Sequence, residues 1–106
     1  MRRFTEELKK DLLDRLQHEL DRCWEQFGED PRYRDLDEAF IRGYSISEGF
    51  DSAIDVFRNG RQWTQRDNEF LTKRDKIWTE YRKRYFSAKH MRDPFSDKTE
   101  REKHKI

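Results

Sequence analysis

Apolar side chains recur every four residues through the first quarter of this 106-residue chain. They are Phe4, Leu8, Leu12, Leu16, Leu20 and Trp24, with Leu13, Cys23 and Phe27 beside them. This spacing places one slanting apolar stripe along an α-helix. Thr5 is suited to cap the start of that helix, and Gly28 to end it. The pattern therefore predicts a helix over residues 6–27.

A second helix is predicted from Pro31 to the Asn59-Gly60 pair, with Asp30 as its N-cap. Its apolar positions are Leu36, Phe40, Tyr44, Phe50, Ile54 and Phe57, widened by Ala39, Ile46 and Ala53. On a helical projection they cover about half of the circumference, whereas an ordinary surface helix covers about a third. An arc this broad indicates a helix with neighbours on two sides, the central element of the domain.

Two glycines interrupt the predicted second helix within FIRGYSISEGFDSAI, residues 40–54. Gly43 and Ser47 lie one turn apart on the apolar arc, so they form a notch for Trp24 or for a ring of the third helix. The sequence leaves two alternatives, a continuous or kinked helix and a break within residues 45–49. The helical period survives the glycines, which favours the first, although each mid-helix glycine costs about 1 kcal/mol relative to alanine.

A third helix is predicted after Thr64, which with Asp67 resembles a capping box. Its apolar sector contains Phe70, Ile77, Trp78, Tyr81, Tyr85 and Ala88, with Leu71 at the edge. Asp93-Pro94 is expected to end it. Because no segment alternates with a period of two, the prediction is an all-α fold.

Three long helices joined by short turns predict an antiparallel three-helix bundle formed by residues 1–92. Residues 93–106 are polar and carry no periodic apolar face, so we expect a flexible tail. Charged residues make up 44% of the chain and apolar residues only 32%. The core must therefore depend on the aromatic side chains, which reach 14% of the sequence.

The formal net charge of +1 hides an uneven distribution. Residues 1–57 hold nine basic and fifteen acidic side chains, and residues 58–92 hold eleven basic and four acidic ones. Such asymmetry bears on binding partners. An equally direct interpretation is that two acidic helices attract the basic third one within the molecule.

Cys23 is the only cysteine, so an internal disulfide is excluded and a reducing compartment is expected. No apolar run approaches the length of a membrane span, and the N-terminal residues turn acidic by Glu6, unlike a signal peptide. These observations predict a cytoplasmic protein without a membrane partner.

Enzymatic motifs are lacking. His18 and Cys23 do not share a helix face as a metal-binding pair would, and His90 and His104 have no companion ligands nearby in the sequence. Gly43 and Gly49 lie inside a helical pattern without the strand that precedes a phosphate-binding loop. We therefore expect no enzyme activity, no cofactor, no metal and no small-molecule substrate.

Nucleic-acid binding is the alternative function, because the third helix is rich in cations and aromatic rings. The candidate residues are Arg66, Lys73, Lys76, Arg82, Lys83, Arg84 and Lys89. Two observations weaken it. The rings follow the spacing of a core, and the cations spread around the helix without forming a single stripe.

Protein binding is the favoured function, since aromatic and arginine side chains are enriched in interface hot spots. Ile41, Trp63, Phe86 and Phe95 lie off or at the margins of the apolar stripes and are the candidate contacts. Arg74 projects into the middle of an apolar sector, so either it pairs with an acid of an earlier helix or that sector is exposed to a partner.

The sequence thus predicts a small accessory or adaptor protein with a protein partner. Head-to-tail charge complementarity is also compatible with a homodimer. Small size and the lack of motifs are typical of phage and mobile-element proteins that modulate or inhibit a larger macromolecular machine.

Overall fold

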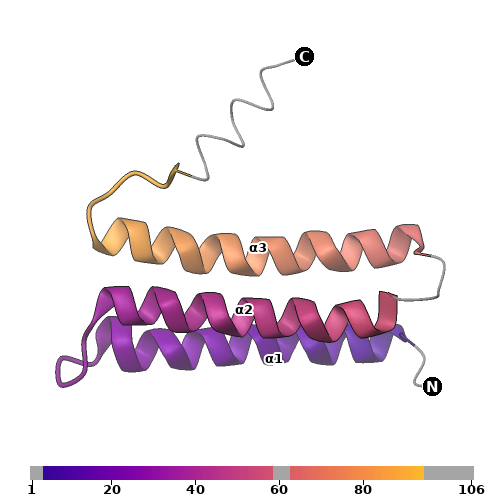
Figure 1. Ribbon diagram of the computed structural model, residues 1–106, viewed down its shortest axis with the longest axis horizontal. Helices are drawn as coiled ribbons and strands as arrows, with labels where there is room; N and C mark the ends of the chain where they lie inside the picture. The colour runs from indigo at the N-terminus through magenta and orange to yellow at the C-terminus, as the bar shows by residue number, and fades with distance from the viewer. Residues whose placement is uncertain (1–3, 59–62, 95–106) are drawn as a thin grey trace, which may run out of the picture.

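The computed structural model describes residues 4–58 and 63–94. Its elements are α1 (Glu6–Trp24), a π-helical turn (Glu25–Glu29), α2 (Leu36–Arg58) and α3 (Gln65–Ala88). Successive helices run in opposite directions, and each packs against the other two (Figure 1). The predicted all-α, antiparallel three-helix bundle is confirmed, and the described part of the chain contains no strand.

The first helix starts as predicted but ends differently. Thr5 caps it, its hydroxyl accepting from the Leu8 amide at 3.1 Å. The expected end at Gly28 is wrong, because the α-helix stops at Trp24 and continues as the π-helical turn. Gly28 is buried under the Trp24 indole, where a Cβ would lie within 2.8 Å of three ring atoms. Glycine is needed there for close packing.

The second helix begins later than predicted. Pro31 lies in a turn, and the Asp30 carboxylate accepts hydrogen bonds from the backbone and side chain of Arg32. Asp35 takes the capping role instead, since its Oδ1 accepts from the Glu38 amide at 3.1 Å. The sequence contains two acids suited to cap a helix here, and the turn engages the first of them.

Helix α2 is continuous through both glycines, as the favoured alternative predicted. Gly43 is buried against α3, where a Cβ would overlap the ring of Tyr81. The expected notch for a ring of the third helix is therefore confirmed. Gly49 differs, because a Cβ there would meet nothing within 4 Å.

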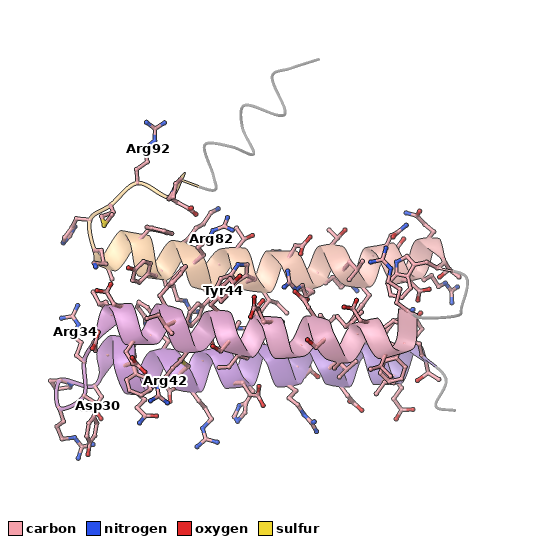
Figure 2. The ribbon with its side chains drawn as sticks, in the orientation of Figure 1. Asp30, Arg34, Arg42, Tyr44, Arg82 and Arg92 are labelled. Atoms are coloured by element: carbon pink, nitrogen blue, oxygen red, sulfur yellow. The ribbon has the colours of Figure 1, made fainter. Side chains whose placement is uncertain are left out.

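The third helix has the predicted start. The Thr64 hydroxyl accepts from the Asp67 amide at 3.2 Å, and the Asp67 carboxylate accepts from the Thr64 amide at 2.9 Å, a complete capping box. The helix ends at Ala88, before the expected stop at Asp93-Pro94. His90 adopts a left-handed conformation (φ 55°), which turns the chain back along α3 (Figure 2). Asn59-Gly60 and residues 95–106 lie outside the described residues.

The core consists of two clusters, one at each end of the bundle. The cluster beside the α1–α2 connection contains Leu16, Leu20, Cys23, Trp24, Ala39 and Tyr81. The cluster at the opposite end contains Phe4, Ile54 and Phe70, with Leu8, Leu12, Phe57 and Trp63 packed against them. Rings join the helices in both, with centroid distances of 5.9 Å for Trp24–Tyr81 and 5.1 Å for Phe4–Phe70.

Ion pairs also join the helices, and in three of those described the cation comes from α3 or from the residue after it. They are Arg84 with Asp21 at 3.2 Å, Lys89 with Asp37 at 2.6 Å, and Arg74 with Asp51. Lys9 of α1 and Asp67 of α3 form the reverse pair, buried, at 2.7 Å. Part of the charge asymmetry of the sequence is therefore used within the molecule.

Candidate protein-binding face

Two large side chains of α2 are exposed one turn apart, and one of them lies beside a tryptophan of α3. Ile41 is 59% exposed and Tyr44 is 49% exposed. They are neighbours one turn apart on α2. The Tyr44 ring lies 6.1 Å from the half-buried indole of Trp78, centroid to centroid, and lies between the two helices in Figure 2. Ile41, Tyr44 and Trp78 are called the apolar patch below.

Carboxylates continue this surface toward the C-terminal end of α2. Positions 41, 44, 48, 51 and 55 are separated by steps of three and four, so they follow one line along the helix. The acids are Glu48, Asp51 and Asp55 on this line and Asp75 on α3, and we call them the acidic stretch. Together the apolar patch and the acidic stretch form the α2–α3 face.

Arg74 lies at the base of the acidic stretch. Its guanidinium pairs with Asp51 and donates to Ser47 Oγ at 2.8 Å and to Asp75 Oδ1 at 2.9 Å. Only 15% of its side chain is exposed. Of the two alternatives for Arg74, the structure shows the first, pairing with an acid of an earlier helix.

The acids of this face influence one another. Partial burial raises the pKa of Asp51, and repulsion from Asp75 and Asp55 adds to the shift, while Arg74 opposes it. The hydrogen bond to Glu48 raises the pKa of the Tyr44 hydroxyl. The phenol therefore stays protonated and joins the apolar patch to the acidic stretch.

The sequence-predicted partner residues are dispersed. Ile41 lies in the α2–α3 face. Trp63 is partly buried at the far end of the bundle, with its ring 5.8 Å from Phe4 and with the Arg58 guanidinium 5.3 Å from its centroid. Phe95 lies outside the described residues.

Phe86 is buried, contrary to the expectation that its ring lies at the margin of the core. Its centroid lies 6.0 Å from that of Phe40 and 4.9 Å from that of Tyr85. A projection of α3 alone does not include Phe40 of α2, whose ring packs against that of Phe86. The ring is therefore not offered to a partner in this structure.

The sequence-predicted nucleic-acid residues fall into two groups. Arg82, Arg84 and Lys89 pair with carboxylates, at 3.0 Å in the case of Arg82 and Asp93. Arg66, Lys73, Lys76 and Lys83 are exposed and form no ion pair within residues 4–58 and 63–94. Arg66 and Lys73 border a hollow that also contains Glu6, Asp14 and Glu69. The cations are therefore interspersed with acids.

Tyr44 and Trp78 were missed as surface residues because both follow core spacing. The broad apolar arc of α2 did not separate Tyr44 from the core, because such an arc is also expected of a helix with neighbours on two sides. Tyr44 nevertheless is 49% exposed.

A second surface feature is an open groove of about 850 Å³ between α1 and α2. Phe27, Ile46 and the edge of Cys23 line it. The Cys23 thiol is 7% exposed and donates to the Ala39 carbonyl at 3.6 Å, and the Tyr81 hydroxyl donates to the same carbonyl. Burial and the neighbouring thiol raise the pKa of Tyr81 above its ordinary value. These groups join all three helices inside the core.

Within the described residues, no three His, Cys, Asp or Glu side chains gather as metal ligands would. Over the same ranges, no helix combines the length and apolar character required to cross a membrane. Comparison with protein-family models, curated proteins and solved structures finds no match. The case for any function therefore rests on the chain itself.

Proposed function

We propose that this chain is a small, non-enzymatic accessory or adaptor protein that binds another protein through the α2–α3 face. One observation carries the proposal. Ile41 and Tyr44 are exposed one turn apart on α2, and the Tyr44 ring lies beside that of Trp78 on α3, although only 32% of the chain is apolar. Aromatic side chains grouped at a surface and surrounded by polar groups are typical of interface hot spots.

Single exposed apolar residues are common on protein surfaces and carry no such meaning. Val56 is an example, since it is 73% exposed and lies about four turns away from Ile41 along α2. The apolar patch differs because Tyr44 links its members, lying one turn from Ile41 on α2 and 6.1 Å, centroid to centroid, from Trp78 on α3. Contiguous exposed apolar surface indicates an interaction site more strongly than scattered residues do.

The test is a nuclease-treated affinity capture from lysate of the source cells, with mass spectrometry as the readout. We expect Ile41→Asp to abolish capture of the partner and Val56→Asp to preserve it. Both positions are exposed on the same helix, so they form a matched pair. Circular dichroism verifies that both variants remain helical. Equal capture by the two variants would contradict the proposal.

Nucleic-acid binding is the second candidate, favoured by the exposure of Arg66, Lys73, Lys76 and Lys83 without ion pairs in the described ranges. Interspersed acids would repel phosphates near these cations. Replacing Lys73, Lys76 and Lys83 by glutamate should abolish binding to single-stranded RNA or DNA if this candidate is correct. Nuclease-sensitive capture that survives Ile41→Asp would favour it over protein binding.

A further inference from the structure

The α2–α3 face has different charge at its two ends. Near the apolar patch, Asp37 is neutralised by Lys89 at 2.6 Å, and Arg82 is paired with Asp93. Residual charge at that end is therefore small. An apolar surface with neutralised edges favours contact with apolar side chains of a partner.

Uncompensated negative charge accumulates at the other end. Among residues 4–58 and 63–94, Arg74 is the only cation paired within the acidic stretch, and it is shared by Asp51 and Asp75. Glu48 and Asp55 pair with no cation of the described residues. The acidic stretch thus carries four carboxylates against one guanidinium, and it favours a partner with positive charge.

The spacing of the face fits a helix. Positions 41, 44, 48, 51 and 55 alternate steps of three and four residues, the pattern that allows another helix to pack alongside. From Ile41 to Asp55 the line is about 21 Å long at 1.5 Å per residue. Helices α2 and α3 lie side by side, so such a helix would pack against both of them (Figure 1).

We infer that the α2–α3 face binds a basic, amphipathic helix of a partner protein. Its apolar side chains cover Ile41, Tyr44 and Trp78, and its lysine or arginine side chains, about two turns further along, meet the acidic stretch. This inference rests on the proposed function and adds the chemistry of the partner. A nucleic acid does not fit, because its phosphates would face the carboxylates.

A second copy of this chain fits less well than a separate protein. Its basic helix, α3, already packs its own apolar residues Phe70 and Tyr81 into the core. Several of its cations are also held by acids of the same molecule, as in the pair of Arg84 with Asp21. A helix that offers both apolar and basic groups must therefore come from elsewhere.

The test uses the full chain as bait for a display library of helical peptides about 15 residues long. We expect the selected peptides to combine an apolar face with lysine or arginine and to bind less tightly as salt increases. Three variants then measure the contributions. They are Ile41→Asp in the apolar patch, Glu48→Lys with Asp55→Lys in the acidic stretch, and Val56→Asp as the control.

The expected result is that Ile41→Asp and the double charge reversal each weaken peptide binding tenfold or more, roughly the effect of losing a complementary contact. Val56→Asp should leave affinity within about twofold. Glu48 and Asp55 are exposed and hold no cation of the described chain, so their reversal should preserve the fold. Thermal unfolding of each variant verifies this.

The outcomes separate this inference from the proposed function. Loss of binding with Ile41→Asp but not with the charge reversal would keep the face and overturn the basic partner. Selected peptides that are neutral or acidic would overturn it as well. Peptides insensitive to both changes would overturn the face itself. Concentration-dependent dimerisation abolished by Ile41→Asp would assign the face to a second copy and overturn a separate partner.

Discussion

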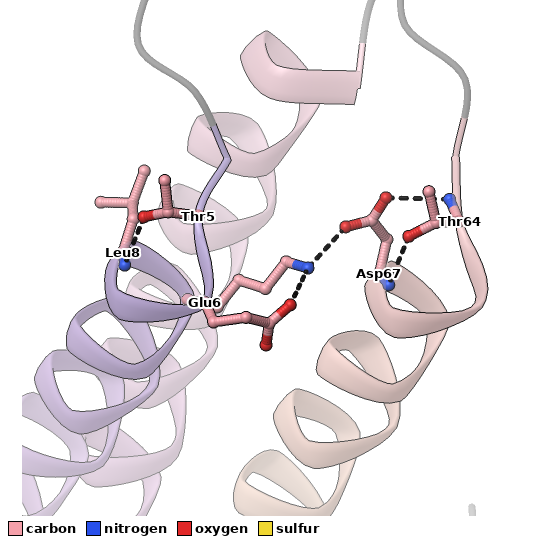
Figure 3. Close-up of polar contacts among 6 residues, drawn as sticks. Thr5, Glu6, Leu8, Thr64 and Asp67 are labelled. Carbon is pink, nitrogen blue, oxygen red and sulfur yellow. Dashed lines mark hydrogen bonds and ion pairs between the residues drawn. The ribbon is translucent and has the colours of Figure 1, made fainter.

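The two ends of the bundle are held together by different means. At the end beside the α1–α2 connection, rings lie directly on glycines, Trp24 on Gly28 and Tyr81 on Gly43. At the opposite end, Phe4 packs among other rings, and the buried Lys9–Asp67 pair joins α1 to α3 (Figure 3). A chain with few aliphatic residues thus combines close backbone approach at one end with a buried charge pair at the other.

The difference suggests how each end should fail. A glycine that is covered by an aromatic ring tolerates no added atoms, because the ring is fixed by its own contacts in the core. A buried charge pair tolerates no loss of either member, because the remaining charge stays desolvated. The first end should therefore be sensitive to additions and the second to deletions and to pH.

The largest effect is expected for Asp67→Ala. Asp67 is fully buried, pairs with Lys9, and completes the capping box with Thr64. Removing it leaves the Lys9 ammonium without its buried partner and should lower the free energy of unfolding by about 3–5 kcal/mol. Urea unfolding followed by circular dichroism measures the change.

The matched control removes the other acid that Lys9 contacts. Glu6 lies 3.0 Å from Lys9 Nζ, but its side chain is 65% exposed. We expect Glu6→Gln to change the free energy of unfolding by less than about 1 kcal/mol. If the two variants lose equal stability, burial of the Asp67 pair does not distinguish this end of the bundle.

The next largest effect is expected for Gly43→Ala, at the end of the bundle where rings pack on glycines. The added methyl group would overlap the Tyr81 ring, so helices α2 and α3 must separate. Overpacking of this kind commonly costs about 1–3 kcal/mol. Thermal unfolding, with near-ultraviolet circular dichroism to report the aromatic packing, measures it. Unchanged stability would show that the Tyr81 ring can move aside.

The end of the bundle that contains the Lys9–Asp67 pair should also lose stability in acid. The hydrogen bonds with Lys9 and Thr64 outweigh burial and lower the pKa of Asp67 from 3.8 to about 2. A lowered pKa in the folded state means that the stabilisation is complete above pH 3.8 and is lost as the pH falls through about 2. The loss should amount to about 2 kcal/mol.

Urea unfolding measured between about pH 5 and pH 2 tests this, with Asp67→Asn as the comparison. This pH interval spans the range in which aspartate ordinarily titrates. The variant should be less stable at pH 5 and should show a smaller dependence on pH. Parallel curves for the two proteins would assign the acid sensitivity to other carboxylates. Gly43→Ala should keep the full dependence, because it leaves Asp67 in place.

The smallest effect is expected for Gly49→Ala and has the opposite sign. Gly49 is exposed in the middle of α2, and a Cβ there meets nothing within 4 Å. The substitution should raise the free energy of unfolding by about 0.5–1 kcal/mol, because alanine favours the helix. Thermal unfolding beside Gly43→Ala measures both. Destabilisation by Gly49→Ala would mean that helix propensity does not explain the difference between the two glycines.

Local signals in the sequence were sufficient for the helices and for one contact between them. Thr64 and Asp67 are three residues apart, so the capping box depends on neighbours within one turn. The position of Gly43 on the apolar arc of α2 predicted that a ring of α3 could pack there, and the Tyr81 ring does. The N-cap at Asp30 was wrong because Asp35 offers the same chemistry five residues later, and a local signal does not choose between them.

The candidate site was less predictable. Ile41 was identified from its position off the apolar stripe, but Tyr44 and Trp78 follow core spacing and were assigned to the interior. Phe86 was assigned to the surface and is buried where the chain turns back after α3. Whether such a ring is covered depends on neighbours that are far away in the sequence.

The sequence by itself therefore determined that three amphipathic helices form and that α2 has a notch at Gly43, because these features depend on residues one or two turns apart. Tertiary structure decided that Arg74 meets Asp51, that Tyr44 stays exposed and that Phe86 is covered. These outcomes depend on the rotation and axial offset of each helix. Packing of the whole core sets both quantities, and no single segment carries that information.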